Sequence, residues 1–171
     1  GLGEMSRIFH RFYNEHLIRG RWKTEKRPLL INSWEAAYFD FDTDKLAAFA
    51  HEAGKLGIEL LVMDDGWFGK RNNDKAGLGD WYVNMKKLPS GIKGLSEKIN
   101  EMGLMFGLWV EPEMVNPDSD LFRAHPDWAL TDEFAPVTGR NELLLDLTKP
   151  EVRDYIVQSV TNILDNANIS Y

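Results

Sequence analysis

Leu60-Leu61-Val62-Met63-Asp64-Asp65-Gly66-Trp67 is an apolar run that ends abruptly in two acids, a glycine and a tryptophan. Four consecutive hydrophobic residues indicate a strand buried on both faces, as in parallel sheets. Folds of the α/β class place their ligand-binding groups at the carboxyl ends of such strands, where these two carboxylates stand. The stretch therefore predicts an α/β fold with a functional site at this corner.

Three more apolar runs end in polar or aromatic residues in the same way. They are Leu29-Leu30-Ile31 before Asn32-Ser33-Trp34-Glu35, Leu104-Met105-Phe106-Gly107-Leu108 before Trp109-Val110-Glu111-Pro112-Glu113, and Leu143-Leu144-Leu145 before Asp146. Between the runs, apolar residues at three- and four-residue spacing predict helices. These helices are expected over residues 43–56, 95–102, 118–124 and 148–166. The alternation of strands and helices predicts a parallel sheet with right-handed crossovers.

Two architectures compete, a doubly wound dinucleotide-binding sheet and a (β/α)8 barrel. The first needs a glycine-rich turn after its first strand, but Asn32-Ser33-Trp34-Glu35-Ala36-Ala37 contains no glycine. The second needs functional side chains at the ends of several strands, and all four predicted strands have them. A closed barrel takes about 250 residues. We therefore predict a partial TIM (β/α)8 barrel over residues 28–171, with strands 1–4 and their helices. Asn168-Ile169-Ser170-Tyr171 would open strand 5, where the chain is truncated.

The composition restricts the partners and the location of the protein. Of the 171 residues, 43% are hydrophobic and 27% are charged, which is typical of a globular domain. No window of about 18 apolar residues is present, so no membrane span is expected. The net charge of −7 argues against nucleic acid as a partner. The absence of cysteine excludes disulfides and favours a reducing compartment, so we expect a cytoplasmic location.

Residues 1–27 differ from the remainder in charge. Seven Lys or Arg residues against three acids give this segment +4, so the remainder carries −11. A basic arm that binds nucleic acid is one interpretation of this pattern. Acids and aromatic residues interrupt the basic ones, however, which favours a lead-in segment that docks on an acidic body.

Asp64 and Asp65 have three possible roles. They could bind the hydroxyls of a sugar, hold a divalent metal, or form a plain Asp-Gly turn. Neighbouring side chains of a strand point apart, whereas a retaining glycosidase holds its two carboxyls about 5 Å apart on either side of the scissile bond. Adjacent acids can instead contact two hydroxyls on one edge of a sugar, and this interpretation is favoured.

Glu111 and Glu113 lie two positions apart, hence on the same side of an extended segment and roughly 6.5 Å apart. This spacing suits a catalytic pair better than that of the aspartates. Pro112 between them shows that strand pairing has ended, so a structural role is the favoured interpretation.

Trp34, Trp67 and Trp109 each follow a predicted strand. A buried tryptophan is more often part of the core, but three at corresponding positions favour at least one that stacks on a sugar ring. Arg140 precedes the fourth strand and could bind a hydroxyl or pair with an acid across the barrel mouth. The four histidines have no ligand spacing and no glycine-rich phosphate loop is present, so neither a metal nor another cofactor is expected.

Four long motifs resemble the α-galactosidases of glycoside hydrolase family 36. They are residues 30–41 (LINSWEAAYFDF), 63–69 (MDDGWFG), 107–115 (GLWVEPEMV) and 139–147 (GRNELLLDL), and the resemblance covers essentially the whole chain. It implies that Asp64 and Asp65 bind galactose hydroxyls, with Trp34, Trp109 and Arg140 lining the same pocket. We also assign Trp67 to this pocket.

The resemblance further implies a retaining double displacement without metal, by an aspartate nucleophile on strand 5 and an aspartate acid/base beyond it. Neither is expected within this chain, so no catalytic residue is assigned and the chain alone is predicted to be inactive. The resemblance also implies a β-sandwich domain before residue 1, a C-terminal β domain after the barrel, and a homo-oligomeric parent protein. The predicted function is a segment of an α-galactosidase acting on raffinose- or melibiose-type galacto-oligosaccharides. The alternative is a non-catalytic carbohydrate-binding or structural relative.

Overall fold

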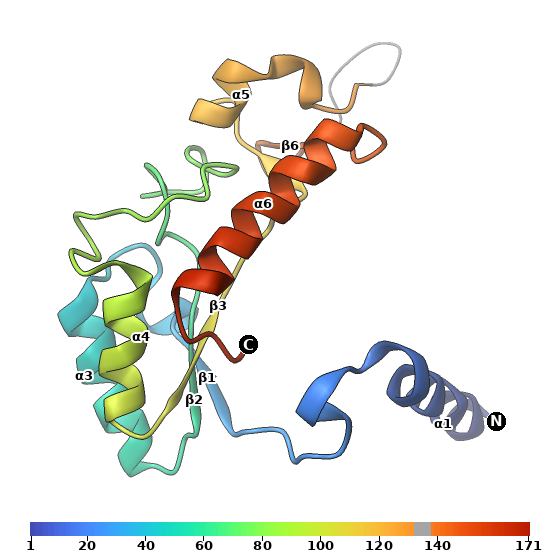
Figure 1. Ribbon diagram of the computed structural model, residues 1–171, viewed down its shortest axis with the longest axis vertical. Helices are drawn as coiled ribbons and strands as arrows, with labels where there is room; N and C mark the ends of the chain where they lie inside the picture. The colour runs from blue at the N-terminus through green and yellow to red at the C-terminus, as the bar shows by residue number, and fades with distance from the viewer. Residues whose placement is uncertain (132–137) are drawn as a thin grey trace.

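The computed structural model describes residues 1–131 and 138–171 (Figure 1). A three-stranded parallel sheet lies at its centre, formed by β1 (Leu30–Asn32), β2 (Leu60–Met63) and β3 (Met105–Leu108) in the order β1-β2-β3. All four residues of β2 are buried. The α/β class and the first three predicted strands are therefore confirmed.

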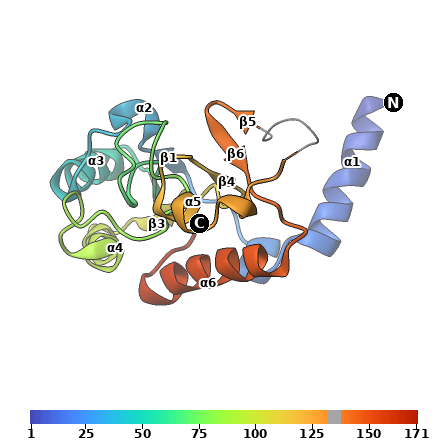
Figure 2. The ribbon, with the colours of Figure 1, turned by 90° about the horizontal axis from the view of Figure 1, so that it is seen from above.

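Helices α3 (Thr43–Lys55) and α4 (Gly91–Glu101) lie side by side on one face of this sheet in Figures 1 and 2. The side chain of Asp42 caps α3 by accepting a hydrogen bond from the Lys45 N–H. Helix α4 begins at Gly91, four residues before the predicted start. Apolar side chains of both helices, of β2 and of the 67–88 loop form the main core.

The short helices α2 (Trp34–Ala37) and α5 (Asp120–Ala124) follow β1 and β4 respectively, and a 3₁₀ turn, η3 (Pro126–Trp128), follows α5. Helix α6 (Pro150–Asn166) runs along the molecule towards the C-terminus in Figure 1. It begins two residues after the predicted start, because the Thr148 hydroxyl donates to Asp146 Oδ1 at 2.6 Å and does not cap the helix.

The predicted fourth strand does not join the parallel sheet, so this part of the fold prediction is wrong. β4 (Met114–Val115), β5 (Thr138–Gly139) and β6 (Glu142–Leu144) form a separate antiparallel sheet in the order β4-β6-β5. The two residues between β5 and β6, Arg140 and Asn141, have φ values of 49° and 63°. Positive φ at both central positions makes a tight hairpin turn, which pairs β6 with β5.

The predicted fifth strand occupies the place assigned to the fourth. The Ser170 N–H donates to the Phe106 carbonyl at 2.8 Å, and the Leu108 N–H donates to the Tyr171 carbonyl at 2.9 Å. The tail therefore runs parallel to β3 at the edge of the central sheet. A second, smaller core under the antiparallel sheet includes Val115, Leu143 and Val152.

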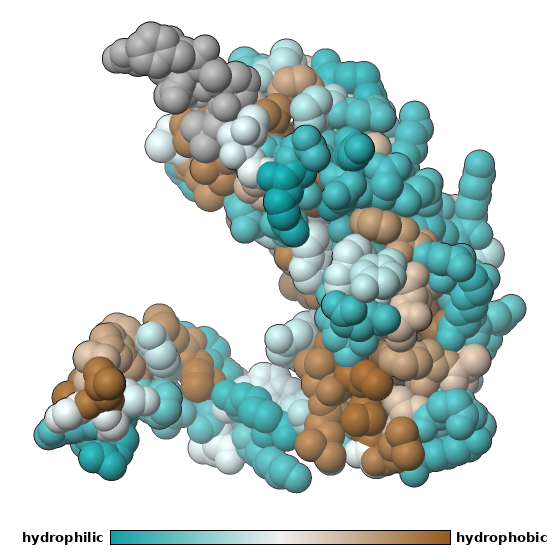
Figure 3. All heavy atoms as spheres, turned by 180° about the vertical axis from the view of Figure 1, so that it is seen from behind, coloured by the Kyte–Doolittle hydropathy of each residue, from teal (hydrophilic) through white to brown (hydrophobic). Residues whose placement is uncertain are grey.

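The amino-terminal segment extends away from the central sheet (Figures 1 and 2) and contacts it at Arg21, whose Nη2 donates to Met105 Sδ at 3.3 Å. It comprises α1 (Leu2–Phe12), the π-helical turn η1 (Tyr13–Leu17) and the 3₁₀ turn η2 (Gly20–Lys23), and none of their residues is buried. Apolar side chains gather on its surface in Figure 3. Within residues 1–131 and 138–171, every helix is too short or too polar to traverse a bilayer.

Candidate functional site

A cleft of about 490 Å³ lies where the carboxyl ends of the three parallel strands face the β5–β6 hairpin. Its walls bring together residues that are far apart in the sequence. They are Trp34, Phe39, Asp64, Asp65, Arg71, Asp74, Trp109, Val110, Glu111, Glu113, Arg140 and Glu142. Five of the six residues assigned from the sequence to a sugar pocket line this one cleft.

Asp64 is held by the neighbouring strand. Its Oδ2 accepts a hydrogen bond from Asn32 Nδ2 at 2.5 Å, and its Oδ1 accepts one from the Asp65 N–H at 2.8 Å. Asn32 also accepts from the Trp34 N–H at 2.7 Å, so one amide side chain fixes both a carboxylate and the start of α2. Asp64 remains half-buried, with its carboxylate at the cleft.

Asp65 has a different environment from that of Asp64. It is 6% exposed, and both of its oxygens accept hydrogen bonds from Arg71, at 2.8–3.0 Å. Burial disfavours the charged guanidinium, but its bonds to Asp65 and Glu142 outweigh this and raise the pKa of Arg71. The two adjacent acids therefore differ in the structure. Asp64 is a partly open hydrogen-bond acceptor, and Asp65 is one partner of a buried ion pair.

Trp67 does not line the cleft, so its assignment to the sugar pocket is corrected. Its side chain is 0% exposed and lies in the main core against Phe68 and Trp81. Its indole N–H donates to the Trp109 carbonyl at 2.9 Å. Gly66, with φ of 104°, turns the chain at this point, and the side chain that follows enters the core. Trp67 supports the backbone of Trp109 from behind.

Trp34 and Trp109 are half-buried and line the cleft from the ends of β1 and β3. The ring of Trp34 meets that of Phe39 edge to face, with centroids 5.1 Å apart. Aromatic rings that are packed on one side and open on the other provide flat apolar surfaces for a ligand.

Arg140 reaches over the cleft from the tip of the β5–β6 hairpin. Its Nη2 lies 3.2 Å from Glu111 Oε1 and 3.3 Å from Glu142 Oε2, although its side chain is 74% exposed. Of the two roles considered from the sequence, the structure shows the pairing with acids. Burial, followed by the nearby charge of Glu142, raises the pKa of Glu111.

The charged groups of the cleft form a chain of alternating sign, Asp65–Arg71–Glu142–Arg140–Glu111. It links the end of β2 to the hairpin and then to the segment after β3, where Glu113 lies beside Glu111 on the cleft surface. Arg71, Glu142 and Asn32 had no assigned role in the sequence interpretation. Polar residues in polar stretches are usually solvated. Burial beside a partner distinguishes Arg71 and Glu142, and the hydrogen bond to Asp64 distinguishes the exposed Asn32.

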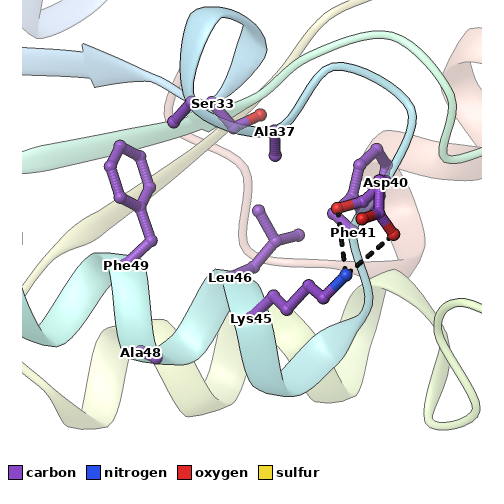
Figure 4. A pocket seen from close by; sticks show the side chains of 9 residues that line it. Ser33, Ala37, Asp40, Phe41, Lys45, Leu46, Ala48 and Phe49 are labelled. Carbon is purple, nitrogen blue, oxygen red and sulfur yellow. Dashed lines mark hydrogen bonds and ion pairs between the residues drawn. The ribbon is translucent and has the colours of Figure 1, made fainter.

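A second hollow, of about 440 Å³, lies beside β1 and α3, and Figure 4 shows most of its lining side chains. Asp40 and Lys45 form an ion pair there, with 2.7 Å between Oδ1 and Nζ. The other lining residues are small or apolar, apart from Ser33. Binding sites usually combine an apolar surface with several converging polar groups, which favours the first cleft as the candidate site. Among the described residues, no three acidic or histidine side chains are grouped so as to hold a metal ion.

The sequence pattern of the melibiase family matches residues 1–171. Alpha-galactosidase AgaA from Geobacillus stearothermophilus is 52% identical over 172 residues, which cover 100% of this chain and 24% of the relative. The bifunctional alpha-galactosidase/sucrose kinase AgaSK from Mediterraneibacter gnavus is 49% identical, and the match covers 18% of its length.

A crystal structure of an AgaA variant from Geobacillus stearothermophilus in complex with raffinose has a similar fold. Its TM-score is 0.92 at 51% sequence identity, and the match covers 100% of this chain and 24% of that chain. This chain therefore spans about a quarter of the length of the AgaA protein and of the AgaA structure that it matches.

Proposed function

We propose, since this chain belongs to the melibiase family, that the protein carrying it is an α-galactosidase. It hydrolyses terminal α-galactosyl residues of raffinose- or melibiose-type oligosaccharides with retention of configuration. The observation that carries the proposal is the cleft in which Asp64, Asp65, Trp34, Trp109 and Arg140 converge. A crystal structure of a 51% identical relative in complex with raffinose supports the substrate class.

The groups of the cleft match the chemistry of a pyranose. A sugar has hydroxyl groups on its rim and C–H groups on its faces, so it needs acceptors, donors and flat apolar surfaces. Asp64 and Asp65 supply acceptors, Arg140 supplies donors, and the indole rings of Trp34 and Trp109 supply the surfaces. In this proposal the segment binds and orients the galactosyl residue.

The covalent steps are assigned to two aspartates outside this chain, as the family resemblance implies. The tail supports this assignment, because Ser170 and Tyr171 run parallel to β3. A residue that follows Tyr171 in a longer protein would emerge beside Trp109, at the same edge of the sheet as the cleft. We also propose that the central sheet belongs to a (β/α)8 barrel, in which this tail, and not residues 143–145, is the fourth strand.

The proposal is tested with the complete protein that carries residues 1–171. It should release the chromophore from an aryl α-galactoside, and NMR of the first-formed sugar should show the α-anomer. An initial β-anomer would overturn the retaining mechanism. Binding of galactose without turnover of any α-galactoside would favour the alternative of a non-catalytic carbohydrate-binding relative.

A further inference from the structure

We propose that the buried Arg71 is a positioning residue of the sugar site, which fixes the carboxylate of Asp65 before any sugar binds. This inference rests on the proposed function and assigns a role to a residue that need not touch the sugar. The guanidinium of Arg71 is 2% exposed and stands behind Asp65 at the cleft wall.

The contact between the two side chains fixes the direction of the carboxylate. Arg71 Nε donates to Asp65 Oδ1 at 2.9 Å and to Oδ2 at 3.0 Å, and Nη2 donates to Oδ2 at 2.8 Å. A fork of N–H groups on both carboxylate oxygens defines an orientation as well as a distance. If the Asp65 side chain turned away, it would leave a buried guanidinium without its main counter-charge, which is costly.

The guanidinium is itself held by three other segments of the chain. Nη1 donates to Asn116 Oδ1 at 2.8 Å and to the Ala76 carbonyl at 3.4 Å, while Nη2 donates to Glu142 Oε1 at 3.2 Å. The backbone of Arg71 is also closely packed, because a Cβ added at Gly77 would lie 2.7 Å from the backbone nitrogen of Arg71. Contacts with the hairpin and with the loop after β4 therefore fix the position of the Arg71 guanidinium, and the guanidinium in turn fixes the carboxylate of Asp65.

The functional consequence is a binding group that needs no reorganisation. Among the described residues, the carboxylate of Asp64 accepts a side-chain hydrogen bond from the exposed Asn32, whereas Asp65 is locked from behind by a buried guanidinium with four partners. Because the orientation of Asp65 exists in the free protein, a hydroxyl that it binds does not have to offset the entropy of ordering it. The expected role is therefore in binding affinity more than in the turnover rate.

A lysine keeps the positive charge of Arg71 but lacks the fork, so Arg71→Lys separates positioning from charge. Arg123→Lys is the matched control, because Arg123 pairs with Asp118 and Asp120 on the exposed surface near α5, outside the cleft. In the complete protein we expect Arg71→Lys to raise KM for an aryl α-galactoside about tenfold. The value of kcat should change less than about threefold, and Arg123→Lys should leave both constants unchanged.

A double-mutant cycle with Asp65→Asn distinguishes positioning from general support of the fold. If Arg71 acts through Asp65, Arg71→Lys adds little to the loss of kcat/KM already caused by Asp65→Asn. Losses that multiply would overturn the proposal, as would an Arg71→Lys protein with the KM of the wild type. If Arg71→Lys does not fold, Glu142→Gln removes the charge of another anchor of the guanidinium and should raise KM about threefold. An unchanged KM in that variant would equally overturn the proposal.

A crystal structure of the Arg71→Lys variant separates this inference from the proposed function. The carboxylate of Asp65 should adopt a new or mixed orientation in it. An unchanged Asp65 contradicts the positioning role whether or not the protein hydrolyses galactosides. Conversely, a displaced Asp65 in the variant, together with a wild-type protein that is inactive on all α-galactosides, would refute the proposed function alone.

Discussion

The two walls of the cleft are built from different kinds of sheet. Trp34, Asp64 and Trp109 follow parallel strands, at the edge where the sequence placed a functional site. Arg140 and Glu142 belong to the antiparallel β5–β6 hairpin, whereas the sequence interpretation placed residues 143–145 in the parallel sheet. The first wall presents mainly acceptors and aromatic faces, and the second presents a guanidinium.

The two walls also differ in how tightly their charged groups are held. Asp65 is 6% exposed and faces an arginine that is 2% exposed, whereas Arg140 is 74% exposed. An exposed ion pair contributes little to stability, while removal of one partner of a buried pair is costly. Substitution of the buried Asp65 on the parallel wall should therefore affect both folding and binding, whereas substitutions at the hairpin tip should mainly affect binding.

Asp65→Ala should have the largest effect, because among the described residues it leaves the buried guanidinium of Arg71 with Glu142 as its one charged partner. The free energy of unfolding should fall by about 3–5 kcal/mol, as for other broken buried pairs. In the complete protein, kcat/KM for an α-galactoside should fall at least about tenfold, because a buried hydrogen-bond partner is lost. Urea denaturation and steady-state kinetics measure the two effects.

Asp64→Ala is the matched control for this prediction, since the carboxylate of Asp64 pairs with the Asn32 amide and not with a buried charge. It should lower kcat/KM to a similar extent while the unfolding transition moves much less. Equal destabilisation by the two variants would contradict the distinction between the two acids.

Much of the parallel wall could be predicted from the sequence. The run 60–63 is apolar at every position, which is the pattern of a strand covered on both faces, and all four residues are buried. The position of Asp64 and Asp65 after this strand then follows from the general placement of ligand groups in α/β folds. The local pattern does not distinguish Trp67 from Trp34 and Trp109, because its burial depends on the turn at Gly66 and on Phe68 and Trp81.

There is a physical reason why the hairpin wall could not be predicted from the sequence. Residues 143–145 form a short apolar run that is compatible with either kind of sheet. The turn that decides between them is formed by Arg140 and Asn141 at positive φ, without the glycine that usually marks such turns. Likewise, the sequence does not reveal that Arg71 is buried, because its partners Asn116 and Glu142 come from distant segments.

The second prediction, whose expected effect is intermediate, concerns the strained backbone at Arg140. Arg140→Ala and Arg140→Gly both remove the guanidinium, so each should lower kcat/KM about tenfold through the loss of a charged hydrogen-bond donor. Glycine relieves the positive φ of 49°, so the Gly variant should be more stable than the Ala variant by about 1 kcal/mol. Denaturation of the two variants side by side measures this difference.

Arg123→Ala and Arg123→Gly form the control pair, because Arg123 lies within helix α5, where glycine is the less favourable residue. The order of stability should therefore be reversed at this position. If Arg140→Gly is not the more stable member of its pair, the hairpin tip does not store backbone strain.

The smallest expected effect concerns the ion pair between the walls and its dependence on pH. Burial raises the pKa of Glu111, and the charges of Glu142 and Glu113 add to this, while Arg140 and Arg71 act in the opposite direction. Glu111 therefore takes up a proton at a higher pH than an ordinary glutamate, and Arg140 then loses the charge of Glu111 and remains paired with Glu142. Because the pKa in the folded state exceeds that in the unfolded state, protonation favours the folded state, so this group does not weaken folding as the pH falls.

We expect galactose binding, measured by calorimetry in the complete protein, to weaken a few-fold as the pH falls from about 7 through the raised pKa of Glu111. Glu111→Gln should bind galactose at neutral pH as the wild type does at low pH, and it should lose this part of the pH dependence. An unchanged pH profile in Glu111→Gln would show that the hairpin wall is positioned without Glu111, by Glu142 and the turn alone.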